Sequence, residues 1–286
     1  MKKGALIFAH NTREIDYAKM AIVSGGLAKK HLQVPVTLVT DMSTQNWMKE
    51  SGTFEKAQDV FEQIILVDRP ESGVMRTHSD GKEKVVTQWN NINRPSAWQV
   101  TPYERTLLLD CDYFTLSDNL NSYWDVDSDL LIAEKYNDIY SKSRTGYLDN
   151  FVSPESVELL WATTVMFTKN EYTKMFFDLV EYIRQNYSTF ADLFRYDPRM
   201  YRNDISFSVA YHILNGFEKT PNHYLPGVLS VPNKDLLYDV KDEKLVFLVS
   251  PQHDTNYCVA TIKDRDVHIM NKSSVERNIE KLMELI

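Results

Sequence analysis

Two aspartates, Asp110 and Asp112, stand one residue apart at the end of the apolar run LLLDCD (107–112). In an extended strand, side chains at positions i and i+2 point to the same side, so the two carboxylates would repel each other unless a cation lies between them. Carboxylate oxygens suit Mg²⁺ or Mn²⁺, ions that usually share their coordination with substrate phosphates. Cys111, between the two, is expected to be a small buried hydrophobe. The alternative is a pair of solvated loop aspartates.

A second stretch with ligand chemistry is DVHIMNK (266–272). Here His268 can bind a metal, Asn271 can donate a hydrogen bond and Lys272 can meet a phosphate as a point charge. Taken alone, His268 is read more simply as a surface or core histidine.

A third stretch, YRNDISFSVA (201–210), places Asn203 and Asp204 at the start of an amphipathic helix. An aspartate at that position either stabilises the helix as a cap or dipole partner, or contacts a substrate. The residue pattern leaves both interpretations open.

The elements that must position these residues alternate in the first part of the chain. Short apolar runs predict buried strands, and the segment 13–32 predicts a helix whose two glycines permit close helix–sheet packing. The predicted strands cover residues 4–11, 34–41, 63–70 and 104–112. Alternation of this kind indicates an α/β fold with a parallel, helix-covered sheet.

Polar residues follow three of these strands: Asn11, Asp41 and Asp110. Ligands of parallel sheets bind outside the carboxyl ends of the strands. We therefore expect the three residues to lie at one rim, around one binding crevice.

The second part of the chain predicts further elements without a clear linker or repeat. Strands are expected over 129–136, 158–170 and 244–250, and a helix or helix pair over 171–194. A helix over 203–216 would end at Gly216, and a C-terminal helix over 273–286 would begin at Ser274. One continuous domain is the simplest organisation.

Composition limits the classes of function. The 286 residues carry a net charge of −8 and only two cysteines, Cys111 and Cys258. No zinc-thiolate spacing, secretory signal or membrane-length apolar run is present, so a cytoplasmic protein is expected. The acidic balance gives no general nucleic-acid footprint, although short basic stretches at 29–31, 82–84 and 141–144 could form a local basic rim. The alternative is that these are solvated surface charges.

Together these motifs resemble a metal-dependent nucleotide-sugar glycosyltransferase of the GT-A fold. The resemblance runs over about residues 4–272, is closest to the glycogenin and galactosyltransferase-like branch, and extends to glycosyltransferases of large tailed bacteriophages. It rests on ALIFAHN, VTLVTD, YERTLLLDCDYF, LWATTVMF, RNDISFSVA and HIMNK, which occur in that order. It implies a single Rossmann-like domain with a mostly parallel central sheet flanked by helices. Residues 1–112 would form the nucleotide-binding half, and residues 113–286 the half for donor sugar and acceptor.

The resemblance also implies roles for individual residues. Asp110, Asp112 and His268 would bind Mn²⁺ or Mg²⁺, and Lys272 would stabilise the departing diphosphate beside Asn271. Arg94 would meet the diphosphate, and Asn203 and Asp204 would act on donor sugar and acceptor. The remaining donor-site residues would be Ala9, His10, Asn11, Arg13, Asp41, Cys111, Thr163 and Thr164. The late motif HIMNKS departs from the glycine and lysine–proline–tryptophan of this branch, which leaves sugar identity and stereochemistry open.

The implied reaction moves a sugar from a UDP-sugar to a hydroxyl acceptor. Hydroxymethylated cytosine in phage DNA is the first acceptor considered, and an enzyme acting on it within a duplex would have to extrude the base. Other readings are a glycan or protein acceptor, and a non-catalytic nucleotide-sugar-binding module. A haloacid-dehalogenase-like phosphatase would also carry Asp-x-Asp after an apolar strand, but usually after its first strand.

Overall fold

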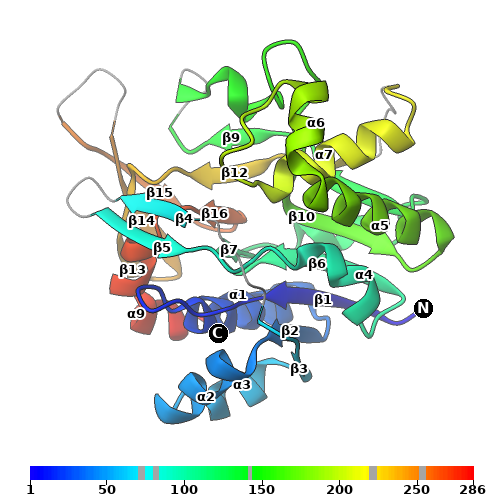
Figure 1. Ribbon diagram of the computed structural model, residues 1–286. Helices are drawn as coiled ribbons and strands as arrows, with labels where there is room; N and C mark the ends of the chain where they lie inside the picture. The colour runs from blue at the N-terminus through cyan, green and yellow to red at the C-terminus, as the bar shows by residue number, and fades with distance from the viewer. Residues whose placement is uncertain (70–74, 80–83, 141–143, 219–223, 251–255) are drawn as a thin grey trace.

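The computed structural model of the 286-residue chain describes residues 1–69, 75–79, 84–140, 144–218, 224–250 and 256–286 (Figure 1). Its centre is a seven-stranded sheet in the order β11-β8-β10-β6-β1-β2-β3. The strands are β1 (Lys3–Phe8), β2 (Val36–Thr40), β3 (Gln63–Leu66), β6 (Arg105–Asp110), β8 (Leu130–Ala133), β10 (Trp161–Thr168) and β11 (Tyr224–Leu225). Only β10 runs antiparallel to its neighbours, β6 and β8. The predicted α/β class with a mostly parallel central sheet is confirmed.

The register of the sheet brings three strand ends to one edge. Phe8 of β1 lies opposite Val39 of β2 on one side and opposite Asp110 of β6 on the other. These strands are continuous apolar runs because both faces of the sheet are covered. Asp110, Asp41 and the residues after Phe8 therefore follow the carboxyl ends of adjacent strands, as the sequence predicted.

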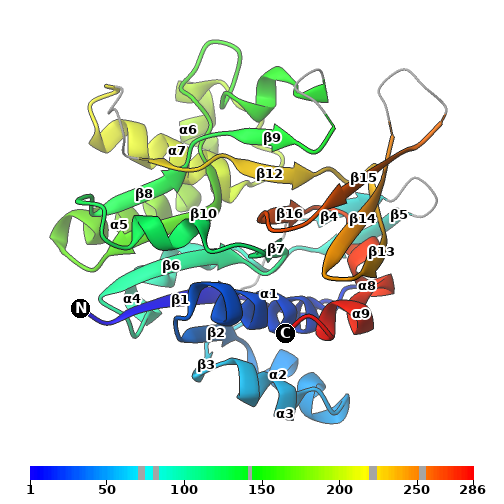
Figure 2. The same cartoon turned by 180° about the vertical axis from the view of Figure 1, so that it is seen from behind.

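Helices flank the sheet in both views (Figures 1 and 2). Helix α1 (Tyr17–Leu32) packs on β1 and β2, while α7 (Asn203–Leu214) packs on β10 with α5 (Glu171–Gln185) beside it. Smaller helices are α2 (Met42–Glu50), α3 (Phe54–Val60), α4 (Ala97–Val100), α6 (Tyr187–Phe194) and the 3-10 turns η1 (Arg94–Ser96), η2 (Asn119–Tyr123) and η4 (Tyr147–Asp149). No helix in the described ranges is long and apolar enough to cross a membrane.

Helix α1 begins later than predicted, because Asp16 caps it by accepting a hydrogen bond from the amide of Lys19. Its two glycines do allow close packing, but the neighbours differ from the expected sheet. A Cβ on Gly25 would lie 2.5 Å from the ring of Phe61, and one on Gly26 would lie 2.6 Å from Ile286. The helix thus packs tightly against the end of α3 and the C-terminus.

The second part of the chain adds strands that the sequence did not reveal. A four-stranded sheet has the order β7-β16-β12-β9, formed by β7 (Tyr113–Phe114), β16 (Val267–Ile269), β12 (Val228–Val231) and β9 (Tyr136–Asp138). A three-stranded sheet contains β13 (Leu236–Lys241), β14 (Lys244–Val249) and β15 (Cys258–Ile262), and β14 matches the predicted strand at 244–250. The hairpin of β4 (Met75–Ser79) and β5 (Lys84–Gln88) forms a separate two-stranded antiparallel sheet.

The predicted helices of this part are confirmed, with two corrections at the C-terminus. Residues 171–194 form the pair α5 and α6, and α7 is followed by Gly216 at φ 63°. At the C-terminus two short helices replace the single predicted one: α8 (Lys272–Arg277) and α9 (Ile279–Met283). The prediction of Ser274 as the cap is wrong, because Asn271 is the N-cap and accepts the hydrogen bond that the Ser274 amide donates.

Candidate active site

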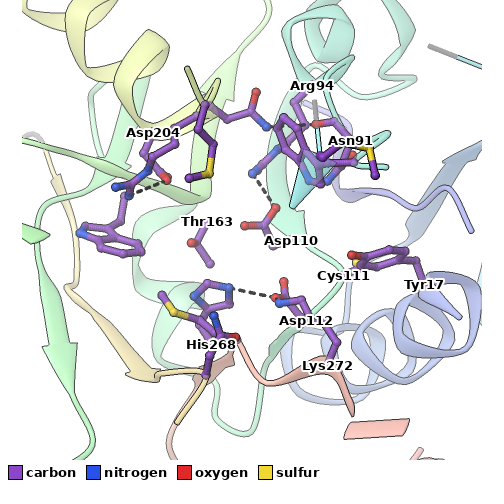
Figure 3. A pocket seen from close by; sticks show the side chains of 18 residues that line it. Tyr17, Asn91, Arg94, Asp110, Cys111, Asp112, Thr163, Asp204, His268 and Lys272 are labelled. Atoms are coloured by element: carbon purple, nitrogen blue, oxygen red, sulfur yellow. Dashed lines mark hydrogen bonds and ion pairs between the residues drawn. The ribbon is translucent and has the colours of Figure 1, made fainter. Parts of the chain in front are cut away.

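A cavity of about 500 Å³ opens beside the carboxyl end of β6 (Figure 3). Its volume is in the range of small-molecule sites in proteins. Asp110, Cys111 and Asp112 line it from the end of β6, and His268 and Lys272 line it from β16 and the start of α8. The sequence stretches 107–112 and 266–272 therefore meet at one cavity.

The pairing of β16 with β7 causes this meeting. His268 of β16 lies opposite Tyr113 of β7 in an antiparallel register, and Tyr113 directly follows Asp112 in the chain. Asp266 reinforces the pairing, because its carboxylate accepts hydrogen bonds from the amides of Leu116 and Ser117 at 2.8 and 2.9 Å. Through this register, two strands that are distant in the sequence place their polar residues on the same cavity wall.

Asp110, Asp112 and His268 each offer a ligand atom, and these atoms lie within 4.8 Å of one another. Nε2 of His268 lies 3.1 Å from Oδ2 of Asp112, and its Nδ1 has no partner among the residues that the structure describes. Burial lowers the pKa of His268, which favours the neutral imidazole that binds metals. Two carboxylates and a neutral imidazole form a suitable ligand set for a divalent cation such as Mn²⁺.

Three ion pairs surround the cavity (Figure 3). Arg94 donates to Asp110 at 2.6 Å and Lys272 donates to Asp112, both within the buried wall. A third pair joins Arg202 to Asp204 at 3.3 Å, with side chains 30% and 21% exposed. Each of the three acids that line the cavity is thus paired with one base.

Arg94 is held deep in the wall by the first turn of η1, and its side chain is 2% exposed. The guanidinium uses Nη1 for Asp110, whereas Nε and Nη2 have no partner among the described residues. Asn91 also lines the cavity. Its side-chain oxygen, Oδ1, likewise has no partner among the described residues. Buried polar atoms without a partner are uncommon in folded proteins, and these guanidinium donors face a cavity in which a water, an ion or a ligand could meet them.

The polar residues after β1 and β2 support this wall from behind. His10 lies between Asp41, 2.9 Å from Nδ1, and Asn93, 3.2 Å from Nε2. Asp41 also caps α2 by accepting from the Thr44 amide at 2.8 Å. Burial raises the pKa of Asp41, but the hydrogen bonds from His10 and Thr44 outweigh it and lower the pKa overall. The chain Asp41–His10–Asn93 therefore anchors the segment that carries Arg94.

The cavity lining does not include every residue predicted to bind the donor. Ala9, His10, Asn11 and Asp41 are buried behind the wall, and Arg13 is exposed. Asn11 is occupied within the fold, since its Oδ1 accepts from the Ala18 amide at 2.7 Å. Their contact with a nucleotide base stays a prediction.

On the far wall, Thr163 of β10 faces the cavity and Thr164 does not line it, as expected for successive residues of a strand. Asn203 and Asp204 line it from the start of α7. Asn203 donates to the carbonyl of Asn91 at 3.1 Å, and Asp204 accepts from the amide of Ala162 at 3.0 Å. Asp204 thus ties α7 to β10 while facing the cavity.

Cys111 and Asn271 take different places. Burial raises the pKa of the Cys111 thiol to about 12, with the carboxylate of Asp110 as a second cause, so the thiol faces the cavity in its neutral form. Asn271 does not line the cavity; it caps α8 and donates to the carbonyls of Asn233 and Asp235 at 2.8 and 3.0 Å. It positions Lys272, its neighbour.

Sequence reasoning missed part of the lining. Arg202 directly precedes Asn203 and Asp204, which were predicted to lie in the site. An arginine beside an aspartate at the start of a helix could have indicated that it lies there too. The other missed residues are two asparagines, Asn91 and Asn233, and apolar or aromatic side chains that gave no signal beyond core packing: Tyr17, Met75, Trp89, Trp161, Met200 and Met270. Trp161 and Arg202 lie together, with the guanidinium 5.8 Å from the indole ring centre.

The basic stretches considered for nucleic acid do not form a described rim of this cavity. Lys29, Lys30 and His31 lie in the last turn of α1, about 18 Å along the helix from Tyr17, which lines the cavity. Residues 82–83 and 141–143 lie outside the described residues. Arg144 is fully buried between Asp138 and Asp235, at 2.6 Å from each.

Comparison with known proteins gives only distant likenesses. No protein-family model and no curated protein matches the sequence. The glycosyltransferase GlyE of Streptococcus pneumoniae TIGR4 is 14% identical over 75% of this chain and 43% of its own, with a TM-score of 0.39. Galactosyltransferase LgtC, in complex with donor and acceptor sugar analogs, is 12% identical over 73% and 70%, with a TM-score of 0.40.

Mouse xyloside xylosyltransferase 1 is 9% identical over 80% of this chain and 85% of its own, with a TM-score of 0.43. This chain spans less than half the length of the pneumococcal protein, with 43% covered. Likenesses this weak assign no activity to the chain, so its function must be argued from its own site.

Proposed function

We propose that this protein is a glycosyltransferase of the GT-A type, which transfers a sugar from a UDP-sugar to a hydroxyl acceptor. The observation that carries the proposal is the meeting of Asp110, Asp112 and His268 within 4.8 Å, at the carboxyl end of a central strand. Two buried cations, Arg94 and Lys272, line the same cavity. Such a set suits a substrate that brings a diphosphate and a divalent cation together.

In this reaction the bond between sugar C1 and the diphosphate oxygen breaks, and UDP leaves with the electron pair. A new bond forms between C1 and the acceptor oxygen, whose proton is released. A divalent cation bound by Asp110, Asp112 and His268 would supply charge neutralisation for the leaving diphosphate. Arg94 presents the unused donors Nε and Nη2, and Lys272 contributes a second positive charge.

Asp204 is the best-placed residue for the acceptor. Its carboxylate accepts a hydrogen bond from the backbone amide of Ala162. This bond fixes the carboxylate at the cavity wall opposite Asp112 and His268 (Figure 3). From there it would orient the acceptor hydroxyl and take its proton, the usual role of a positioned carboxylate. Thr163 and Asn203 flank it and would contact the donor sugar.

A turnover assay tests the proposal. The protein is incubated with Mn²⁺ and each common UDP-sugar, and UDP release is followed with and without EDTA, beside the Asp110→Ala variant. Release that needs Mn²⁺ and is lost in the variant supports the proposal. UDP binding in calorimetry without release from any donor would favour a binding module, and hydrolysis of p-nitrophenyl phosphate without UDP binding would favour the phosphatase.

The acceptor is a separate question within the same assay. Because no described basic stretch borders the cavity, we place glycan and protein hydroxyls first in the acceptor panel and include hydroxymethylated DNA as a further acceptor. Stimulation of UDP release by one acceptor over water identifies its class. Stimulation by the DNA alone would make modified cytosine the acceptor, despite the net charge of −8.

A further inference from the structure

Ser230 and His268 lie opposite each other on neighbouring strands of the four-stranded sheet. They are register partners in the parallel pair of β12 and β16. Such partners point their side chains to the same face of a sheet, and neighbouring strands lie only about 4.8 Å apart. His268 and Met270, two residues apart, both line the cavity, so this face of β16 is turned toward it. Ser230 shares that face, but it is fully buried and is not part of the cavity lining.

Each of these two side chains has a buried polar atom that meets no partner in the described ranges. The atoms are the hydroxyl oxygen Oγ of Ser230 and the ring nitrogen Nδ1 of His268. The other ring nitrogen, Nε2, lies 3.1 Å from Oδ2 of Asp112. Buried polar atoms are usually paired, so two such atoms at facing positions of one strand pair are unusual. A change of the serine side chain between its staggered rotamers would turn the hydroxyl toward the ring.

Nδ1 of His268 needs opposite partners in the free and the metal-bound state. A neutral imidazole carries one proton, on either of its two nitrogens. While Nε2 donates to the carboxylate of Asp112, Nδ1 has no proton and can only accept a hydrogen bond. When Nε2 binds a cation through its lone pair, the proton lies on Nδ1, which can only donate. A serine hydroxyl both donates and accepts, so Ser230 suits both states, whereas a backbone carbonyl could only accept.

Resting on the function proposed above, we propose that Ser230 is a positioning residue that orients His268 in the candidate metal triad of Asp110, Asp112 and His268. In the metal-free protein the hydroxyl of Ser230 donates to Nδ1. When Nε2 binds a divalent cation, it releases its proton to water, Nδ1 takes up another, and the same hydroxyl accepts from Nδ1–H. The ring stays neutral throughout. Partners of this kind fix the tautomer and the orientation of a metal-binding histidine.

Nitrogen-15 NMR of the metal-free protein, labelled at histidine, tests the contact directly. The chemical shift of an unprotonated imidazole nitrogen depends on whether it accepts a hydrogen bond. In Ser230→Ala we expect the Nδ1 signal of His268 to move toward the position of a nitrogen that accepts none. Ser230→Thr, which keeps the hydroxyl, should retain the wild-type signal. The loss of one signal in His268→Gln provides the assignment.

The affinity for Mn²⁺ tests the consequence for the metal. Loss of a partner that orients a metal-binding histidine usually weakens metal binding, so we expect Ser230→Ala to bind Mn²⁺ about 10- to 100-fold more weakly than the wild type. Free Mn²⁺ is measured by its electron paramagnetic resonance signal, with and without UDP, and a titration without protein corrects for Mn²⁺ held by UDP. Ser206→Ala is the matched control, because Ser206 is another fully buried serine outside the cavity lining. It should keep the wild-type affinity and the wild-type Nδ1 signal.

Two results would overturn the inference. The first is an Nδ1 signal of His268 that is the same in Ser230→Ala and in the wild type, which would leave that nitrogen to a water molecule. The second is a weakening of Mn²⁺ binding that is absent in Ser230→Ala or equally large in Ser206→Ala. If the wild type binds Mn²⁺ under neither condition, the proposed function fails, and the NMR comparison still decides whether Ser230 holds His268. If Ser230→Ala does not fold, Ser230→Cys takes its place, because a thiol retains the shape and is only a weak donor.

Discussion

Arg94 donates from Nη1 to Oδ1 of Asp110 at 2.6 Å, while its Nε and Nη2 meet no acceptor among the residues that the structure describes. One guanidinium thus holds a carboxylate of the candidate metal triad and leaves two donors that could meet a ligand. A ligand with anionic oxygens could accept charge-assisted hydrogen bonds from both donors.

Replacing Arg94 by lysine should lower kcat/KM for the UDP-sugar by about 10- to 100-fold, because lysine retains the charge beside Asp110 but loses the planar set of donors. Steady-state kinetics measures the loss, and thermal unfolding checks that the fold survives. Arg195→Lys serves as the control, since the Arg195 side chain is exposed, lies outside the cavity lining and pairs with Glu155. Equal kinetics for Arg94→Lys and the wild type would remove Arg94 from the donor site.

Asp204→Asn should reduce kcat by about 100-fold, the usual contribution of a general acid or base. Asparagine retains a carbonyl oxygen for the amide of Ala162, so the link between α7 and β10 is kept while the charge is lost. The expected signature is a fall in kcat with KM for the donor nearly unchanged. A variant with wild-type kcat would show that Asp204 only holds the helix in place.

We expect the free energy of unfolding to depend on pH through the carboxylate of Asp41. Its folded-state pKa is lowered, so its carboxylate stabilises the fold above the unfolded pKa of about 4, and this contribution is lost as pH falls through the folded-state value. Asp41→Asn should cost about 1–3 kcal/mol of unfolding free energy at pH 6, the usual range for hydrogen bonds to a charged group. The difference from the wild type should shrink below about pH 4.

Urea unfolding between pH 3 and pH 7 measures this difference. A cost that stays constant over the whole range would contradict the assignment, because it would not depend on the charge of Asp41. Activity need not follow the same curve, since Asp41 lies behind the cavity wall and acts on it through His10 and Asn93.

The two cysteines should differ sharply in reactivity. Burial raises the pKa of Cys111 to about 12, whereas Cys258 is exposed. A thiol reagent such as dithionitrobenzoate should therefore modify one cysteine quickly and the other only after denaturation. In the Cys258→Ser variant the fast phase should vanish. A fast phase that persists would mean that Cys111 is accessible and reactive in the folded protein.

The parts of the fold that sequence could predict are those with local signals. The strands β1, β2 and β6 are continuous apolar runs that end in polar residues, so both their positions and their shared edge could be inferred. Asp110 and Asp112 carried a chemical signal of their own, since two carboxylates at positions i and i+2 of a strand repel each other unless a positive charge lies between them. These predictions depended on residues close together in the chain.

The parts that sequence could not predict depend on distant pairing. Nothing in the three residues of β16 indicates that His268 pairs with Tyr113, yet this register brings His268 to Asp110 and Asp112. The resemblance supplied His268 and Lys272, but their contacts with Asp112 follow only from the fold. Asp41 shows the opposite case: an aspartate is a common N-cap residue, so its role at the start of α2 could have been inferred locally.

The central claim is that Asp110, Asp112 and His268 hold a divalent cation against a UDP diphosphate. Crystals grown with Mn²⁺ and UDP, with diffraction recorded at the manganese absorption edge, test it most directly. We predict an anomalous peak in contact with all three side chains and with the diphosphate. UDP bound in the cavity with no manganese peak between the three residues would contradict it.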